Sequence, residues 1–289
     1  MAKIRIDARQ LVTNRILAQL EQGVVPWRQP WNVGAGMLPQ SGVTHKPYRG
    51  INRLLLGMSD YGDPRWFGFS ALAERGGSVV GQKGTKIVKV LTYTYKKAGD
   101  VDEDGDQVER AGRSLRILTV FNAEQITGLN LDPIKVEEFD PIQRAEEIIE
   151  YMPSPPSISY GGARAYYKPS ADHVKVPVRG SYSPATEFYS TMFHELGHST
   201  GHPSRLNRFG PDAKTAPFGT PEYSREELVA EFTAAYLCQM SGIDNTLDLS
   251  ASYLANWSKV LRNDKTMLIA GASRGSAAAD YIVGQSDAV

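Results

Sequence analysis

The segment TMFHELGHSTGH, Thr191–His202, constrains the fold of this chain more than any other, because its chemistry requires a particular local structure. Its histidines His194 and His198 are four residues apart, so on an α-helix both imidazoles lie on one face and can bind the same metal ion. Apolar residues fall on the opposite face of that helix, namely Phe188, Tyr189, Met192, Phe193 and Leu196. The segment therefore predicts a helix over about residues 185–200 with a buried back and a metal-binding front.

The first histidine is followed directly by Glu195, which completes the HExxH pattern. In this pattern the glutamate is a general base that takes a proton from water activated by a zinc ion, and is not itself a ligand. A metzincin would carry a further histidine at position 204, where this chain has Ser204. The third protein ligand is therefore expected from another segment. Zn²⁺ is the default ion for such a site, and Mn²⁺ or Co²⁺ can replace it.

A later helical segment, SREELVAEFTAAYL, offers three glutamates as candidates for that ligand. Glu227 and Glu231 share one stripe beside the apolar face, and carboxylates turned toward a core are costly unless they bind something. We assign Glu227 as the third metal ligand and Glu231 as the acceptor that holds a histidine ring. The reverse assignment remains open, because spacing alone does not fix which carboxylate faces the ion. Glu226 points nearly opposite and is interpreted as a solvated charge.

Three other residues near these segments have two interpretations each. Cys238 lies two turns after Glu231 on the same stripe, where it is either a thiolate ligand or, as we favour, a small buried hydrophobe. His202 either stabilises an oxyanion or shapes the loop after the helix. His173, in a presumed strand, is interpreted as a surface residue.

Charge is distributed unevenly along the chain. Residues 1–99 contain 15 Lys and Arg against 5 Asp and Glu, a net +10, whereas residues 131–289 contain 14 against 20, a net −6. A basic part joined to an acidic part predicts that the first part meets a polyanion. No apolar run is long enough for a membrane span, the first residues do not resemble a signal peptide, and the single cysteine suits a reducing compartment. We therefore expect a soluble, cytoplasmic protein that binds no membrane.

The basic part also concentrates aromatic residues beside arginines and lysines. Cations that follow phosphates and flat rings that stack on unpaired bases are what single-stranded DNA binding requires. Each aromatic residue could equally belong to the core, but their clustering favours an interface. The residues expected to contact single-stranded DNA are Trp27, Arg28, Trp31, Lys46, Tyr48, Arg49, Arg53, Arg65, Trp66, Lys83 and Lys86.

Periodicity and turn residues predict an α+β chain in two domains. Helices are expected over 6–22, 50–58, 144–152, 185–200, 224–241, 250–263 and 265–282, and strands over 78–95, 113–122 and parts of 158–178. The polar segment 96–113 is expected to be a mobile hairpin tip. We place an amino-terminal α+β domain at 1–130, a linker with a short helix at 131–157, and a domain with a small sheet packed on helices at 158–289.

Six motifs in order, PWRQPW, THKPYRGIN, GGSVVGQKG, TVFNAEQITGL, FHELGHSTGHPSRLNR and YSREELVAE, resemble the ArdC antirestriction family of conjugative plasmids. The amino-terminal part also resembles the plasmid TraC primases. The resemblance implies an amino-terminal single-stranded DNA-binding domain and a zincin-like metallopeptidase domain. It carries metal roles to His194, His198 and Glu227, with Glu195 as base, and implies protection of incoming plasmid DNA from host restriction.

Two other functions stay open at this point. In one, the protein occupies DNA and its metal is purely structural. In the other, it is a protease that single-stranded DNA activates against DNA-bound proteins, and parts of the restriction machinery are one possible substrate. The same three ligands would serve all of these functions.

Overall fold

The computed structural model describes residues 7–28, 37–101, 106–135, 138–212, 214–217, 219–243 and 251–285. Within these ranges the helices are α1 (Ala8–Glu21), α2 (Ile51–Gly57), α3 (Phe69–Ala73), α4 (Pro141–Glu150), α5 (Thr186–Ser199), α6 (Pro221–Ser241), α7 (Ala251–Asn263) and α8 (Met267–Ile282). The strands are β1 (Gln40–Ser41), β2 (Arg65–Gly68), β3 (Thr85–Val101), β4 (Gln107–Asn122), β5 (Ser157–Tyr160), β6 (Tyr166–Lys168) and β7 (His173–Val176). The predicted α+β class is confirmed.

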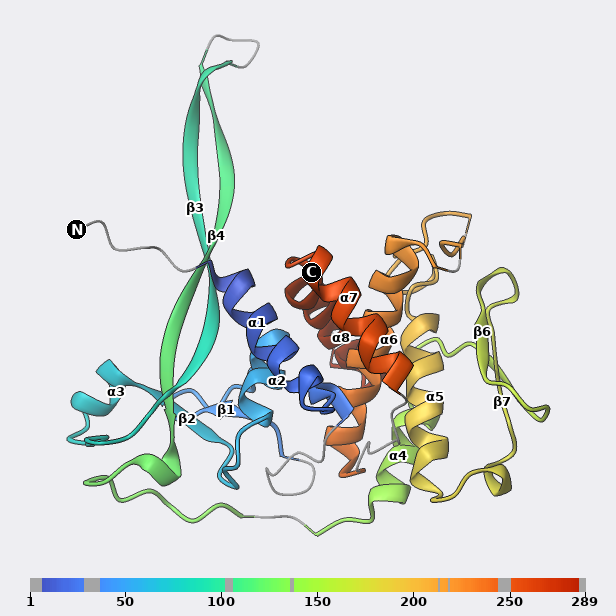
Figure 1. The fold of residues 1–289 in the computed structure, drawn as a ribbon, viewed down its shortest axis with the longest axis horizontal. Coiled ribbons are helices and arrows are strands. Elements are labelled where there is room, and N and C mark those ends of the chain that lie inside the picture. The colour runs from blue at the N-terminus through green and yellow to red at the C-terminus, as the bar shows by residue number, and fades with distance from the viewer. Residues whose placement is uncertain are drawn as a thin grey trace.

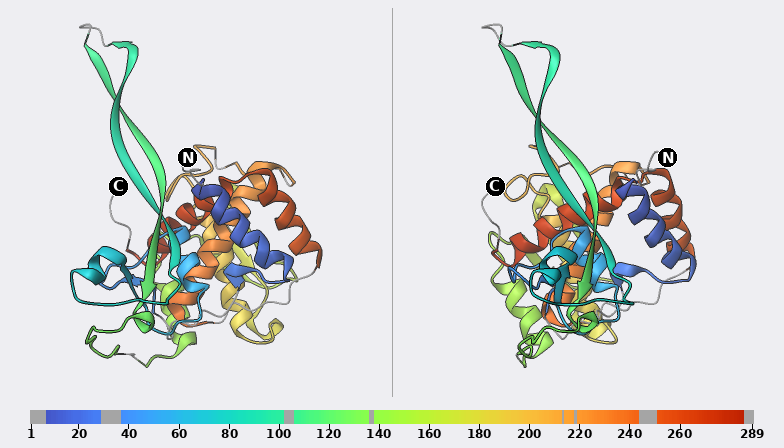
Figure 2. Two further views of the ribbon diagram at one scale, coloured as in Figure 1. Left: turned by 60° about the vertical axis from the view of Figure 1, so that its left-hand side comes forward. Right: turned by 90° about the vertical axis from the view of Figure 1, so that its left-hand side faces the viewer.

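The amino-terminal sheet has the strand order β1-β2-β4-β3 and ends in a long two-stranded ribbon. Strands β3 and β4 pair without interruption from Thr85, opposite Val120, to Lys96, opposite Glu109. The outer part of this ribbon stands away from the rest of the molecule (Figures 1 and 2). The hairpin tip expected over 96–113 is too long, because β3 continues to Val101 and β4 begins at Gln107, and residues 102–105 lie outside the described residues. Pairing with a neighbouring strand outweighs the weak strand preference of glycine and acidic residues.

Helices α5, α6 and α8 form the centre of the other part (Figure 1). The side chain of Thr220 caps the start of α6, Pro221 occupies its first turn, and Gly242 ends it in a left-handed conformation. Gly275 of α8 lets the two helices approach closely, since a Cβ there would lie 2.6 Å from the Cβ of Phe232. Most of α6 is consequently buried on all sides.

The second sheet has the order β5-β7-β6, with β5 parallel and β6 antiparallel to β7. It lies beside α5, and the alternate residues Val174 and Val176 of β7 are buried in the main core. This arrangement agrees with the predicted small sheet packed on helices. His173 lies at the start of β7, where its two ring nitrogens are 2.9 and 2.8 Å from the hydroxyls of Ser157 and Ser159.

The largest hydrophobic core contains residues from both ends of the chain. Val12 and Ile16 of α1, and Trp27 after it, are buried together with Phe232 of α6 and Trp257 of α7. Helix α4, which falls in the predicted linker, adds apolar side chains to the same core. The domain limits near residues 130 and 157 stay a prediction. None of the helices in the described ranges is long and apolar enough to cross a membrane.

Candidate metal centre

Helix α5 brings His194 and His198 together as their spacing predicts. Their ring centroids are 4.8 Å apart, and their Nε2 atoms are separated by 3.1 Å. The opposite face of the helix is buried, including Phe188, Met192 and Leu196. Both imidazoles therefore point away from the core toward one common position.

Helix α6 adds a carboxylate at this position. The two Glu227 oxygens lie 3.6 Å from Nε2 of His194 and 3.5 Å from Nε2 of His198. One ligand atom from each of the three residues can be chosen so that all lie within 4.8 Å of one another, and among the described residues no other such group of His, Cys, Asp and Glu occurs. Two imidazole nitrogens and one carboxylate oxygen are a donor set that suits Zn²⁺ and related divalent ions.

The glycine of HELGH explains how the two helices come so close. A Cβ on Gly197 would lie 3.0 Å from the Cβ of Thr233 and 3.1 Å from the Cα of Ala230. Any larger side chain would therefore push α6 away from α5. Since Glu227 lies one turn before Ala230, this contact also sets its distance from the histidines.

Burial and neighbouring charge act on the protons of these groups. Burial alone lowers the pKa of His194, but its hydrogen bond to Glu227 and the charges of Glu231 and Glu195 outweigh this and raise the pKa to about 9. Burial raises the pKa of Glu227, and the neighbouring histidines and Tyr223 lower it to about 2. The two imidazoles and the carboxylate thus favour a positive charge between them, which is the position that a cation would take.

Two tyrosines lie near the glutamates of the site. Tyr223, one turn before Glu227 on α6, hydrogen-bonds with the Glu227 carboxylate, and burial together with that carboxylate raises its pKa to about 12. Burial also raises the pKa of Tyr182, with a contribution from the charge of Glu195, which is itself buried. Sequence reasoning missed Tyr223, although its spacing of four from Glu227 was a usable signal.

The placement of Glu231 differs from the prediction. Its carboxylate accepts two hydrogen bonds from Arg28, at 3.0 Å from Nε and 2.6 Å from Nη2, and among the described residues no hydrogen bond joins it to a histidine ring. The Arg28 and Glu231 side chains are 16% and 6% exposed. Arg28 was expected to contact DNA, but the turn Pro26–Arg28 directs it into the wall of a cavity of about 260 Å³ beside His194 and Glu227. A distant part of the chain thereby completes this pocket.

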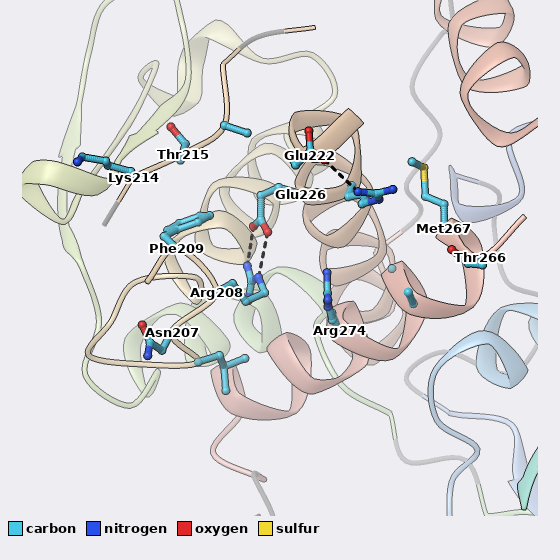
Figure 3. Close-up of a pocket in the computed structure, with 15 residues that line it drawn as sticks. Asn207, Arg208, Phe209, Lys214, Thr215, Glu222, Glu226, Thr266, Met267 and Arg274 are labelled. Atoms are coloured by element: carbon cyan, nitrogen blue, oxygen red, sulfur yellow. Dashed lines mark hydrogen bonds and ion pairs between the residues drawn. The ribbon is translucent and has the colours of Figure 1, made fainter. Parts of the chain in front are cut away.

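Glu226 takes the position expected of Glu231. Its Oε1 lies 3.5 Å from Nδ1 of His198, and Arg208 binds both carboxylate oxygens at 3.0 and 2.7 Å. Arg208 also donates to Thr200 and to the carbonyl of Gly197, so it joins the loop after α5 to that helix. Figure 3 shows this ion pair at the edge of a second pocket of about 770 Å³. The interpretation of Glu226 as a solvated charge is wrong, because α5 covers two adjacent residues of α6.

Comparison with known proteins agrees with both parts of this description. Residues 6–121 match a family model described as the N-terminal domain of anti-restriction factor ArdC, and residues 143–274 match one described as a zincin-like metallopeptidase. Crystal structures of the antirestriction protein ArdC from plasmid R388, metal-free and Mn(II)-bound, share 31% and 30% identity with this chain and a TM-score of 0.73 each. They cover 96% and 97% of this chain, which covers 97% and 98% of theirs. The chain belongs to the ArdC antirestriction family.

Longer relatives share this ArdC-family region. Two DNA primases TraC of Escherichia coli are 34% and 32% identical over 98% and 95% of this chain, which spans only 28% and 20% of their length. The uncharacterized protein y4eC of Sinorhizobium fredii (strain NBRC 101917 / NGR234) is 30% identical, over 98% of this chain and 94% of its own length. The ArdC-like chain therefore also occurs as one part of larger proteins.

Three of the residues expected to bind DNA in this ArdC-family chain are buried. Trp27 is 0%, Trp66 1% and Arg53 2% exposed, so these side chains are not available to bases or phosphates. Trp27 packs against Phe232 and Trp257, with ring centroids 5.4 and 5.7 Å apart. The clustering that favoured an interface therefore arises for these residues from packing against distant segments.

The other expected DNA contacts differ in pairing and exposure, and Arg49 is both paired and exposed. Arg49 binds Asp280 at 2.5 Å, Arg65 binds Asp63 at 2.7 Å, and Tyr48 is partly buried. Lys46, Lys83 and Lys86 are exposed, and Lys86 donates a hydrogen bond to Thr119. Trp31 lies outside the described residues. His202 bonds with Ser204 in the loop after α5, and Cys238 is buried within the core.

Proposed function

We propose that this chain is a plasmid antirestriction protein that binds single-stranded DNA in the cytoplasm and carries a divalent-metal peptidase site. The observation that supports the peptidase part is the convergence of His194, His198 and Glu227, with Glu195 beside them, in a chain of the ArdC family. Zn²⁺ is the expected ion in the cell. One of the crystal structures of R388 ArdC is Mn(II)-bound, and this ion suits the same donor set.

The proposed chemistry is hydrolysis of a peptide bond. His194, His198 and Glu227 would hold the ion, which supplies Lewis acidity that polarises the scissile carbonyl and makes water more acidic. Glu195 accepts a proton from the attacking water and passes it to the leaving amine. Glu226 keeps the His198 ring oriented, and Tyr223 keeps the Glu227 carboxylate turned toward the histidines.

Removing the base separates hydrolysis from simple occupancy of DNA. In a Glu195→Gln variant we expect metal content and DNA affinity to be unchanged, while peptide cleavage and protection of transferred plasmid DNA are lost. Glu187→Gln, on the same helix and away from the histidines, is the matched control. If Glu195→Gln protects as well as the unaltered chain, the hydrolytic part is wrong and the metal is structural.

The DNA-binding part has a separate test. In filter binding, the full chain should prefer single strands to duplex, with an affinity that falls as salt rises. Equal and salt-insensitive retention of both would contradict it. Peptide cleavage measured with and without single-stranded DNA tests the third function, in which the strand activates a protease.

A further inference from the structure

The outer ribbon of β3 and β4 carries a row of exposed residues on one face. Antiparallel pairing puts Lys89 opposite Arg116, Tyr93 opposite Gly112, and Tyr95 opposite Arg110. Because alternate residues of a strand point to the same side, these side chains share one face of the ribbon. We call the set Lys89, Tyr93, Tyr95, Arg110 and Arg116 the tyrosine face.

The tyrosine face lies beyond the hydrophobic core. Ile87 and Val88, near the base of the ribbon, are buried, whereas Tyr93 and Tyr95 are 51% and 43% exposed. The outer end of the ribbon stands clear of the helices (Figure 2). A two-stranded ribbon without a core gains little stability from burial, so this part of the chain adds little to the folding of the body.

The two tyrosines form an aromatic platform. Their ring centroids are 6.0 Å apart with an angle of 43° between the planes. The ring of Tyr93 covers Gly112, since a Cβ there would lie 2.6 Å from the Tyr93 Cζ atom. Covering a strand glycine is a structural role for one side of Tyr93. This role does not explain why the outer side of the Tyr93 ring and the Tyr95 ring are exposed.

The charges beside this platform are arranged against the stability of the ribbon. Lys89 and Arg116 are direct cross-strand neighbours, and like charges in that position repel each other. Neither forms an ion pair with a described carboxylate, whereas Lys96 on the opposite face lies 3.8 Å from its neighbour Glu109. Arg110 at the outer end is held by Asp100 at 2.5 Å. An uncompensated pair of cations in front of two exposed rings fits a ligand that brings its own negative charge.

We propose that the tyrosine face is the site where the chain binds single-stranded nucleic acid. Unpaired bases stack on Tyr93 and Tyr95, while Lys89 and Arg116 bind the phosphates on the side of the body. This inference rests on the proposed function that the chain binds single strands, and it places the contact on the ribbon, away from the buried tryptophans. A duplex has no free base faces, so stacking selects single strands.

The first experiment removes the rings and keeps the charges. Binding of the full chain to a fluorescent oligo(dT) is measured by anisotropy for Tyr93→Ala/Tyr95→Ala and for Tyr93→Phe/Tyr95→Phe. We expect the alanine variant to bind at least about 5-fold more weakly for each ring removed, and the phenylalanine variant to bind almost normally. The control is Thr92→Ala/Thr94→Ala on the opposite face of the same strand.

The second experiment removes the charges, and here stability and binding are expected to change in opposite directions. Lys89→Ala/Arg116→Ala relieves the repulsion, so the melting temperature should not fall, yet the salt slope of single-strand binding should fall by about 0.7 for each phosphate that is no longer neutralised. Arg113→Ala, a cation on the other face, should alter the slope less.

The outcomes separate this inference from the proposed function. If the unaltered chain binds oligo(dT) and the alanine variants bind equally well, the ribbon is not the site and the function stands. If the unaltered chain does not bind oligo(dT), the proposed function itself fails. Loss of duplex binding as large as loss of single-strand binding, or equal losses for alanine and phenylalanine variants, would overturn stacking.

Discussion

Charged side chains are paired in the metal pocket between α5 and α6, but two neighbouring cations on the outer ribbon of β3 and β4 are not paired with a described carboxylate. In the pocket, charged groups are buried and bound by partners, as Arg28 with Glu231 and Arg208 with Glu226. On the ribbon, Lys89 and Arg116 are exposed, adjacent and of the same sign. Paired charges in the pocket hold its side chains in one geometry, whereas the unpaired cations of the ribbon are available to a ligand.

The strongest test of the pocket removes one of the proposed ligands. His194→Ala should abolish stoichiometric metal binding and peptide cleavage, because two remaining ligands do not form a closed site and even groups that only orient ligands contribute about 10–100-fold. Inductively coupled plasma analysis of the dialysed chain measures the metal. His173→Ala, on β7, is the control. An unchanged metal content in His194→Ala would refute the site.

The next largest effect concerns stability. Arg28→Ala leaves the Glu231 carboxylate buried without its cation, which should lower the free energy of unfolding by about 3–5 kcal/mol. Arg116→Ala on the ribbon should not measurably change the free energy of unfolding. Urea unfolding of both variants measures the contrast, and Glu231→Ala with Arg28→Ala/Glu231→Ala completes a double-mutant cycle for the ion pair. If Arg28→Ala and Arg116→Ala were equally stable, the pocket and the ribbon would not differ in how their charges contribute to stability.

The same pair predicts how stability depends on pH. Burial raises the pKa of Glu231, but the charge and hydrogen bonds of Arg28 outweigh this and lower it below the ordinary value of 4.5. The ion pair therefore stabilises the fold above that pH, and its contribution is lost as pH falls through the lowered pKa. In Arg28→Ala the buried Glu231 carboxylate has no cation beside it, so its protonation stabilises the folded variant. The stability gap between the two proteins, measured with a chelator present, should begin to narrow above pH 4.5, where the lone carboxylate takes up its proton, and should narrow further until Glu231 of the unaltered chain is protonated.

A smaller effect on metal affinity is expected for Glu226, which contacts a proposed ligand and not the ion itself. Glu226→Gln removes the charge that faces His198 and Arg208, so metal affinity should fall by about 10–100-fold without loss of the fold. Glu222→Gln, an exposed glutamate one turn earlier on α6, is the matched control. Competition with a chromogenic chelator gives the affinities. Equal affinities for the two variants would show that Glu226 does not orient the ring.

The parts of the site that local geometry determines could be predicted from the sequence. The positions of His194 and His198 follow from four residues of helix, and the structure places them on one face as expected. The choice between Glu226, Glu227 and Glu231 was different, because it depends on how α6 lies against α5. That contact is set by Gly197 against Ala230, which periodicity does not reveal.

The burial of the aromatic residues could not be predicted from the local sequence either, because it depends on contacts with distant segments. Trp27 is buried because Phe232 and Trp257, from helices far along the chain, cover it. Proximity to arginine in the sequence carried no information about this. A signal for the ribbon was present in TYTY, since a period of two places Tyr93 and Tyr95 on one face. The polar residues that follow Tyr95 suggested a loop, so the strand was expected to end there and not at Val101.

The smallest effect tests whether the Tyr93 ring must lie flat on the ribbon to bind. Gly112→Ala puts a methyl group where the ring now sits, so the ring has to tilt or swing away. We expect single-strand affinity to fall by up to about 5-fold, the value of one stacked base, while the ribbon itself is not weakened, because alanine suits a strand better than glycine. Ser114→Ala, two residues further along β4 on the same face, should change neither property. Unaltered binding by Gly112→Ala would mean that Tyr93 only covers the glycine, and the platform would reduce to Tyr95 and the cations.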